Sequence, residues 1–301
     1  MRVLVIGYGS IGVRHVEILK GMEFEVSVLT KQKGLPERTF HSLKDALSFN
    51  SPDYVIIANK TCEHYFTLKN LAEIGFEGTV LVEKPLFHKI FVLPQHKFKG
   101  AWVGYNLRFH PLIQKLRRII EKEPAISVQV IAGQYLPHWR PATDYRLSYS
   151  ARRQEGGGVL RDLSHELDYV QWLTGPIAVK YVVNEKVSNL DIETDDLLLL
   201  SGQTEDGAHL QICLNYFTRK PLRQILIDGE NISIRADLVE NTLSVVERNE
   251  TYNYSWPELE RNETYRAQHK AILEDDLSYL CTYGEGLEIM RLIDGIRSFN
   301  S

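Results

Sequence analysis

The stretch "VLVIGYGSIGVRHVEIL", residues 3–19, predicts the fold of the first part of the chain. An apolar run over residues 3–6 predicts a buried strand, and Gly7, Gly9 and Gly12 follow in G-x-G-x-x-G spacing before a helical pattern. In such a strand–turn–helix unit the first glycine makes the tight turn, the second lets a pyrophosphate approach the backbone, and the third lets helix and strand pack closely. The phosphates would bind the free N–H groups at the helix start, where the helix dipole favours negative charge.

The second strand ends in "TKQKG", residues 30–34. A dinucleotide with a free ribose 2′-hydroxyl normally meets Asp or Glu at this place, but this chain has Thr30, Lys31 and Lys33. A hydroxyl and two ammonium groups suit a 2′-phosphate better, which favours NADP over NAD. A solvated lysine turn explains the same residues equally well.

A further strand–helix pattern follows at residues 51–73, and a fourth strand pattern at residues 78–86. Repeated units of this kind predict a parallel sheet with helices on both faces, and such sheets bind ligands at the carboxyl ends of their strands. Asn59 and His64 follow one strand, and the triplet Glu83-Lys84-Pro85 follows the next. The triplet is therefore placed like a site, with a solvated turn as the alternative.

After residue 106 the pattern changes to an amphipathic helix at residues 110–124 and then to seven strand-like runs joined by polar turns. Runs of consecutive strands predict an antiparallel sheet. The expected fold is thus α/β plus α+β, with a doubly wound parallel Rossmann sheet over residues 1–106 and a mainly antiparallel sheet over residues 107–301.

A candidate catalytic stretch lies in the second part, at residues 155–175, "EGGGVLRDLSHELDYVQWLTG". After three glycines the pattern predicts one helix that carries Asp162, His165 and Asp168 on neighbouring positions of one face. Carboxylates beside a histidine can orient it and raise its basicity, as a general base near neutral pH requires. A helix-start aspartate with an ordinary core or surface histidine is the alternative.

Together these motifs resemble the Gfo/Idh/MocA family of NAD(P)-dependent oxidoreductases. They occur in the family's order and span nearly the whole chain: G-x-G-S-I-G-x-R-H at residues 7–15, Asn59 with His64, Glu83-Lys84-Pro85, Gly104-Tyr105-Asn106, the glycines 156–158 with His165-x-x-Asp168, and "EGLEIMRLIDGIRS" at residues 285–298. The resemblance implies a Rossmann domain, a second domain built on a large open sheet, and a sugar, inositol or nucleotide-sugar substrate that exchanges a hydride with nicotinamide C4.

The resemblance also implies catalytic roles. Lys84 matches the family's catalytic lysine, whose ammonium can stabilise a developing alkoxide, and His165 matches its proton acceptor. Glu83 would orient the lysine and the nicotinamide, and the proline after Lys84 is often cis in the family. The family's catalytic aspartate stands four residues before the histidine, where this chain has Arg161. Either the helix start shifts, or Asp162 acts less directly.

Binding residues are assigned on the same resemblance. The cofactor would contact Gly7, Gly9, Ser10, Ile11, Gly12, Thr30, Lys31, Ala58, Asn59, His64 and Glu83. The substrate would contact Tyr105, Arg108, Trp139, Arg140, Tyr145 and Asp168. The aromatic and arginine-rich stretch at residues 135–151 resembles a subgroup of surface-polysaccharide or nucleotide-sugar metabolism, although a loop held by aromatic packing at a subunit contact is an equal alternative. Between Pro85 and Gly104 the helix usual in relatives is degenerate.

Composition limits the remaining choices. A net charge of −4, with lysines and arginines spread along the chain, argues against a nucleic-acid partner. No apolar stretch approaches the length of a membrane span, and the first residues lack a signal peptide's h-region, so we expect a cytoplasmic protein. Cys62, Cys213 and Cys281 form no Cys-x-x-Cys pair, which argues against disulfides and zinc, and no metal site is expected.

Assembly and two competing functions complete the predictions. The alternating apolar residues at 208–217 and 223–229 would form a large patch on an open sheet, so we expect a homodimer or homotetramer. A catalytically silent dinucleotide-binding regulator of the same fold is the main alternative function. An S-adenosylmethionine enzyme is a more remote one, since it would leave Glu83-Lys84-Pro85 unexplained.

Overall fold

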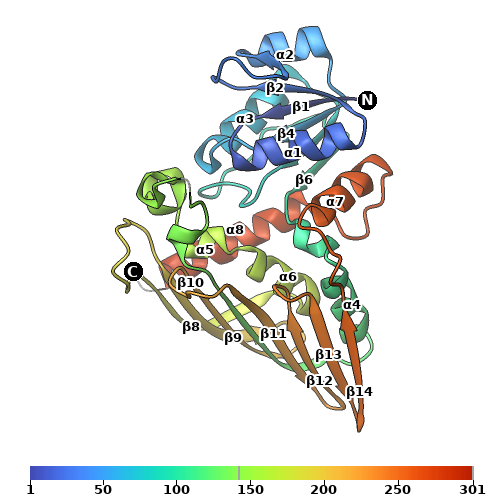
Figure 1. Ribbon diagram of the computed structural model, residues 1–301, viewed down its shortest axis with the longest axis vertical. Helices are drawn as coiled ribbons and strands as arrows, with labels where there is room; N and C mark the ends of the chain where they lie inside the picture. The colour runs from blue at the N-terminus through green and yellow to red at the C-terminus, as the bar shows by residue number, and fades with distance from the viewer. Residues whose placement is uncertain (142, 300–301) are drawn as a thin grey trace. The chain divides into compact units, whose positions relative to one another are not determined.

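The computed structural model describes residues 1–141 and 143–299. These residues divide into two compact units (Figure 1). The first unit comprises Met1–Asn106 and Asn262–Met290, and the second comprises Leu107–Arg261 and the chain from Arg291 onward.

The first unit is built on a seven-stranded sheet in the order β15-β6-β5-β4-β1-β2-β3. All neighbouring strands are parallel except β15 and β6. The strands are β1 (Arg2–Ile6), β2 (Glu25–Leu29), β3 (Arg38–Phe40), β4 (Tyr54–Ile57), β5 (Thr79–Val82), β6 (Gly100–Val103) and β15 (Cys281–Thr282). This order confirms the predicted Rossmann sheet, whose strand order reverses between β1 and β4, where such sheets bind ligands.

The helices of the first unit are α1 (Ser10–Gly21), α2 (Leu43–Asn50), α3 (Thr61–Ile74), α7 (Glu263–Leu273) and the first half of α8 (Tyr283–Ser298). Every residue of β4 is buried, and so are the last three of β5, which means that both faces of the sheet are covered. Residues 86–99 contain neither helix nor strand, as the sequence predicts for this segment.

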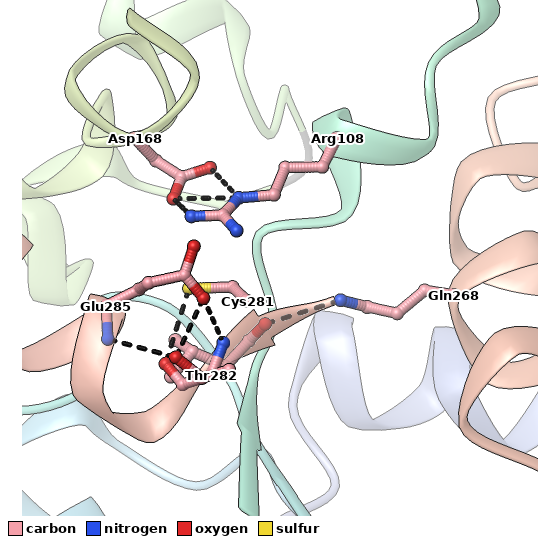
Figure 2. Close-up of polar contacts among 7 residues, drawn as sticks. Arg108, Asp168, Gln268, Cys281, Thr282 and Glu285 are labelled. Atoms are coloured by element: carbon pink, nitrogen blue, oxygen red, sulfur yellow. Dashed lines mark hydrogen bonds and ion pairs between the residues drawn. The ribbon is translucent and has the colours of Figure 1, made fainter. Parts of the chain in front are cut away.

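Residues 262–290 differ from the expected division, because they pack with the first unit. Helix α7 contacts α1, and Gln268 of α7 donates to the Val103 carbonyl of β6 at 3.4 Å (Figure 2). Strand β15 joins the sheet beside β6. Thr282 and Glu285 then cap α8 reciprocally, with Thr282 N and Oγ1 donating to Glu285 Oε2 and Glu285 N donating to Thr282 Oγ1.

The second unit is built on an eight-stranded sheet in the order β14-β13-β12-β11-β7-β10-β9-β8. Its strands are β7 (Ala125–Gly133), β8 (Ile177–Glu185), β9 (Leu197–Thr204), β10 (His209–Asn215), β11 (Leu222–Gly229), β12 (Ile232–Asp237), β13 (Thr242–Glu247) and β14 (Glu250–Ser255). Only β7 and β10 run parallel, which confirms a mainly antiparallel sheet. The sequence misses β14, because this edge strand is exposed along most of its length and lacks an apolar alternation.

Helices of the second unit are α4 (Pro111–Ile120), α5 (Val159–Asp162), α6 (His165–Thr174) and the end of α8. Short 3₁₀ turns occupy Asn106–Phe109, Leu136–His138, Tyr145–Leu147, Tyr149–Ala151 and Arg153–Glu155. Helix α5 packs on β9 and β10, and α6 packs on β7 (Figure 1).

The prediction of one continuous helix through Asp162, His165 and Asp168 is wrong. Leu163 has φ −98° and ψ 31°, which is not helical, so α5 ends at Asp162 and α6 begins at His165. Asp162 and His165 therefore lie on different helices, and only Asp168 shares a helix with the histidine.

The apolar residues that suggested an exposed patch are buried within the second unit. Leu210, Ile212 and Leu214 of β10 and Ile225 and Ile227 of β11 are at most 2% exposed. These side chains form the core under α5 and α6, so they leave no open apolar patch. No helix among residues 1–141 and 143–299 is long and apolar enough to cross a membrane.

Candidate functional site

The glycine turn after β1 leaves no room for larger residues at two of its positions. Gly7 has φ +99°, and a Cβ there would lie 2.5 Å from the Asn59 nitrogen. A Cβ on Gly12 would lie 2.1 Å from the Gly7 oxygen. Around Gly9, by contrast, no atom of the described residues other than its two chain neighbours comes within 4 Å of a Cβ position. The turn is thus packed on the protein side and open at Gly9.

The start of α1 has the features of a phosphate site. Gly9 is the N-cap residue, no side chain caps the helix, and its first turn holds no acidic residue. Gly9 and Ser10 are exposed, with Ile11 partly buried behind them. The backbone N–H groups and the positive end of the helix dipole are consequently available to an anion.

The residues after β2 lie next to this turn. Gln32 donates through Nε2 to the Tyr8 carbonyl at 2.9 Å, which ties the two loops together. Thr30 is partly buried, and its Oγ1 accepts from the Gln32 N–H at 3.3 Å. Lys31 is exposed. The carboxyl end of β2 therefore presents an ammonium group to solvent, with a hydroxyl beside it.

Asn59 and His64 follow β4, and they play different parts. Asn59 donates through Nδ2 to Thr67 Oγ1 at 2.9 Å, while its buried Oδ1 has no partner in the described chain. His64 is 1% exposed, and its ring nitrogens face the carbonyls of Asn59, Pro85 and Leu86 at 3.1–3.2 Å. Burial lowers the pKa of His64, although these carbonyls oppose the shift. His64 thus pins the loop after β5 to the loop after β4.

The Glu83-Lys84-Pro85 loop is tightly held. The Lys84–Pro85 bond is cis. Glu83 is 6% exposed; its Oε2 accepts from the Lys84 backbone N–H at 3.2 Å, and its Oε1 lies 2.9 Å from His15 Nε2. A Cβ on Gly104 would lie 2.8 Å from Glu83 Oε1, so the glycine of the Gly104-Tyr105-Asn106 motif makes room for this carboxylate. Tyr105 itself is 1% exposed.

Sequence reasoning missed the groups behind Glu83. His15 Nδ1 lies 2.9 Å from His269 Nε2, and His269 Nδ1 lies 3.0 Å from the Tyr54 hydroxyl. All three side chains are fully buried. His15 stands in the glycine motif and could have been singled out there, but His269 lies 254 residues further on, without a local signal that links it to the motif.

In the second unit Asp162 lies among aromatic side chains. Its Oδ2 accepts from the Tyr216 hydroxyl at 2.6 Å, and it is also hydrogen-bonded to Tyr149. Burial, followed by the Asp162 charge, raises the pKa of both tyrosines. The Trp139 ring meets Tyr216 edge-on, with centroids 5.3 Å apart. His165 is 9% exposed at the start of α6.

Arg108 and Asp168, both predicted to contact a substrate, contact each other within the second unit (Figure 2). Arg108 Nη2 donates to Asp168 Oδ1 at 2.7 Å, and Nε lies 3.2 and 3.1 Å from the two carboxylate oxygens. The side chains are 3% and 0% exposed. This is a buried bidentate ion pair, with Arg108 also over the Trp172 ring.

The predicted substrate-binding residues of the aromatic loop, residues 135–151, lie in two different places. Arg140 is exposed and lies over the Tyr149 ring at 5.6 Å, so Arg140 and Trp139 both reach the tyrosines of Asp162. Tyr145 lies elsewhere, where its hydroxyl accepts from the Asp191 N–H at 3.2 Å. The loop thus brings two of its three predicted substrate residues to the Asp162 cluster.

No group of three His, Cys, Asp or Glu side chains within residues 1–141 and 143–299 could hold a metal ion. Cys62, Cys213 and Cys281 form no disulfide bond, and burial raises the pKa of Cys213.

Part of the second unit matches the model of a known protein family. Residues 113–235 match the model of the GFO/IDH/MocA C-terminal domain, which confirms the resemblance found in the motifs. Among curated proteins, an uncharacterized oxidoreductase of Synechocystis sp. is 25% identical over 174 residues, 56% of this chain and 45% of that protein. The chain thus matches less than half of that relative's length.

Solved structures share the fold over nearly the whole chain. Levoglucosan dehydrogenase in complex with NADH has a TM-score of 0.83 at 17% identity, over 99% of this chain and 96% of that one. UDP-N-acetylglucosamine 3-dehydrogenase GnnA from Acidithiobacillus ferrooxidans has 0.79 at 19% identity, over 99% and 97%. WlbA dehydrogenase from Bordetella pertussis, in complex with NADH and UDP-GlcNAcA, has 0.77 at 19% identity, over 99% and 95%.

Proposed function

We propose that this chain belongs to the Gfo/Idh/MocA family and is an oxidoreductase that transfers a hydride between nicotinamide C4 and a hydroxyl-bearing carbon of a sugar or nucleotide sugar. The observation that carries this proposal is that an open glycine turn and the hydrogen-bonded Glu83-Lys84-Pro85 loop lie at the carboxyl edge of one Rossmann sheet. The bound NADH and sugar compounds of the structurally similar dehydrogenases support the same substrate class.

The residues of the first unit fit a nicotinamide dinucleotide. Gly9 leaves space for a pyrophosphate, and the uncapped N–H groups of Ser10 and Ile11 would bind it. The unpartnered Oδ1 of Asn59 offers an acceptor to the cofactor at the end of β4, next to Ala58. The bound cofactor would supply the nicotinamide ring that accepts or gives the hydride.

In this proposal Lys84 and His165 act on the substrate hydroxyl. As the hydride leaves its carbon, the ammonium of Lys84 would stabilise the alkoxide that develops. His165 would take the hydroxyl proton as general base, and it would return that proton in the reductive direction. Asp162 would support the site through the tyrosine cluster, in which Trp139 and Arg140 would contact the sugar or its phosphate.

Two finer assignments belong to the proposal. NADP is preferred over NAD, since Thr30 and the exposed Lys31 suit a 2′-phosphate and no acidic side chain stands at residues 30–34. The protein works in the cytoplasm, which three cysteines without a disulfide bond support.

A catalytically silent dinucleotide-binding regulator is the second candidate, because one observation favours it. Arg161 stands where relatives carry their catalytic aspartate, and it is 4% exposed. Burial, with the Arg297 charge as the next cause, lowers the pKa of Arg161 to about 10. The intact Lys84 and His165 favour the enzyme.

Fluorescence titration of the purified chain with NADPH, NADH and S-adenosylmethionine, followed by a turnover screen over sugars and nucleotide sugars, tests the proposal. We expect saturable binding of a nicotinamide dinucleotide and turnover of at least one compound. Binding without any turnover would favour the regulator, and binding of S-adenosylmethionine alone would contradict both candidates.

A further inference from the structure

Four buried polar groups form a continuous hydrogen-bonded chain in the first unit. It runs from Glu83 Oε1 to His15 Nε2 at 2.9 Å, from His15 Nδ1 to His269 Nε2 at 2.9 Å, and from His269 Nδ1 to the Tyr54 hydroxyl at 3.0 Å. Glu83 is 6% exposed and the other three are not exposed at all. The groups come from the loop after β5, from α1, from α7 and from β4.

One arrangement of protons satisfies every group in this chain. A carboxylate only accepts, so His15 must donate from Nε2 to Glu83. A neutral His15 then accepts at Nδ1, which requires His269 to donate from Nε2. His269 in turn accepts at Nδ1 from the Tyr54 hydroxyl. Burial lowers the pKa of His269 and raises that of Tyr54, so both are neutral.

The arrangement has a direction, with three donors in series that end on one carboxylate. If His15 were an imidazolium, its second N–H would point at His269 Nε2. His269 would have to move its proton to Nδ1, and the buried Tyr54 hydroxyl would lose its acceptor. The rings of Tyr265 and His269 lie edge-on to His15, with centroids 5.6 and 5.0 Å away, and the Arg14 guanidinium lies over the Tyr265 ring.

We infer that His15, His269 and Tyr54 are positioning residues that hold Glu83 as a carboxylate in one orientation. Glu83 is then fixed at both oxygens, because Oε1 accepts from His15 while Oε2 accepts from the Lys84 N–H. These hydrogen bonds determine the positions of Lys84 and of the Glu83 carboxylate beside the nicotinamide ring. This inference rests on the proposed function, since it assigns the carboxylate to the nicotinamide end of the cofactor.

The hydrogen-bonded series also gives a function to α7, which lies far from the glycine motif in sequence. His269 is 254 residues from His15 and 215 residues from Tyr54. Only the folded arrangement of α7 against α1 brings it between them. A segment near the end of the chain thereby controls the geometry of the Glu83 loop.

Nitrogen NMR of the full chain with ¹⁵N-labelled histidine tests the proton arrangement without a substrate. We expect both His15 and His269 to be neutral at pH 7, each with its proton on Nε2. An imidazolium or an Nδ1–H tautomer at either residue would overturn the inference. In Tyr54→Phe we expect His269 to keep its proton on Nε2, while its Nδ1 resonance shifts because that acceptor loses the Tyr54 hydroxyl. Tyr169→Phe is the matched control, because Tyr169 is equally buried and its hydroxyl has no partner in the described chain.

Binding measurements then test the positioning role. We expect His269→Leu to weaken the binding of the dinucleotide that the wild type prefers by about tenfold, roughly the effect of one neutral hydrogen bond. Binding of the matching ADP-ribose fragment, which lacks nicotinamide, should stay unchanged. His269→Gln, whose amide N–H can replace Nε2–H toward His15, should recover most of the loss.

Three outcomes separate the possibilities. Equal losses for dinucleotide and fragment in a folded His269→Leu protein would show a merely structural role and overturn the inference. Equal losses in His269→Gln and His269→Leu would also overturn it, since the donor to His15 would then be irrelevant. If the wild type binds no nicotinamide dinucleotide, the proposed function fails, and with it the assignment of this carboxylate, whatever tautomers the histidines have.

Discussion

At the residue scale, the proposed preference for NADP rests on Lys31. Its ammonium is exposed at the carboxyl end of β2, beside the glycine turn. Lys31→Asp should therefore weaken NADPH binding far more than NADH binding, because a carboxylate repels a 2′-phosphate and accepts from a 2′-hydroxyl. Fluorescence titration with both nucleotides measures this. Lys97→Asp, the same charge change at an exposed position, is the control, and equal losses for the two nucleotides would refute the lysine assignment.

Among single residues, the largest effect on the free energy of unfolding is predicted for Arg108 and Asp168. Because both side chains are buried, the loss of one leaves an uncompensated charge. Arg108→Met should lower the free energy of unfolding by about 3–5 kcal/mol. The double variant Arg108→Met with Asp168→Leu should recover a large part of that loss. Urea denaturation measures all three proteins.

The exposed pair Lys69–Glu73 supplies the control for this comparison. Lys69→Met should change the free energy of unfolding by less than about 1 kcal/mol, as for other surface ion pairs. An Arg108→Met protein as stable as the Lys69→Met protein would show that the buried pair contributes nothing.

Whether the contacts of a single residue could be predicted depended on how far apart in the sequence the contacting residues lie. Gly7, Gly9 and Gly12 act through neighbours within one strand–turn–helix unit, so spacing alone places them correctly. Arg108 and Asp168 are 60 residues apart, and nothing local in the sequence shows that each neutralises the other. His269 was missed for the same reason, since its partners His15 and Tyr54 lie in distant elements.

At the scale of an element, α4 has a cap that titrates. His110 Nδ1 accepts from the Leu112 N–H at 3.2 Å, and Nε2 lies 3.1 Å from Asn241 Oδ1. Burial, only partly opposed by the Asn241 bond, lowers the pKa of His110 to about 4. The neutral ring is thus the one that caps the helix, because protonation would convert the acceptor into a donor.

The depressed pKa of His110 fixes the sign of a pH dependence. Between about pH 6.5 and pH 4 the unfolded chain binds the proton and the folded one does not, so stability falls as pH falls through this window. His110→Asn keeps a capping side chain and removes the titration. Its unfolding free energy should lose less over this window than that of the wild type, by on the order of 3 kcal/mol. Parallel slopes for the two proteins would contradict this account of the cap.

Elements were predictable where periodicity was strong, and they failed where tertiary contacts override it. Strands β7 to β13 follow from their alternation, whereas β14 forms by pairing with β13 despite an exposed, polar sequence. The α5–α6 break is invisible to helical spacing, since Asp162, His165 and Asp168 fit one helix as well as two. Asp162 is instead held by Tyr216, which follows β10.

At the scale of the whole molecule, we still expect a homodimer or a homotetramer through the open face of the eight-stranded sheet, but for a reason other than the one the sequence suggested. The residues thought to form the patch are buried under the helices. The opposite face of the sheet carries a short row of apolar side chains across β9, β10 and β7. In this row Leu199 and Ile131 both pair with Cys213. Leu199 is 38% exposed, so Leu199→Lys should shift the protein toward monomer in light scattering.

Val92→Lys is the control for assembly, because Val92 is an exposed apolar residue of the first unit, 86% exposed. It should leave the mass unchanged. A wild type that is strictly monomeric at micromolar concentration would contradict assembly through this sheet.

Hydride transfer assisted by Lys84 is the central claim, and rapid-mixing measurement of nucleotide absorbance tests it most directly, with a substrate from the turnover screen. Lys84→Met should lower the rate by about a hundredfold, which corresponds to about 3 kcal/mol in the transition state, with dinucleotide affinity nearly unchanged. His165→Asn should slow the reaction similarly and flatten the acidic limb of its pH profile, because the titrating base is removed. Full activity in Lys84→Met would contradict the account, since it would make the Glu83-Lys84-Pro85 loop an ordinary turn.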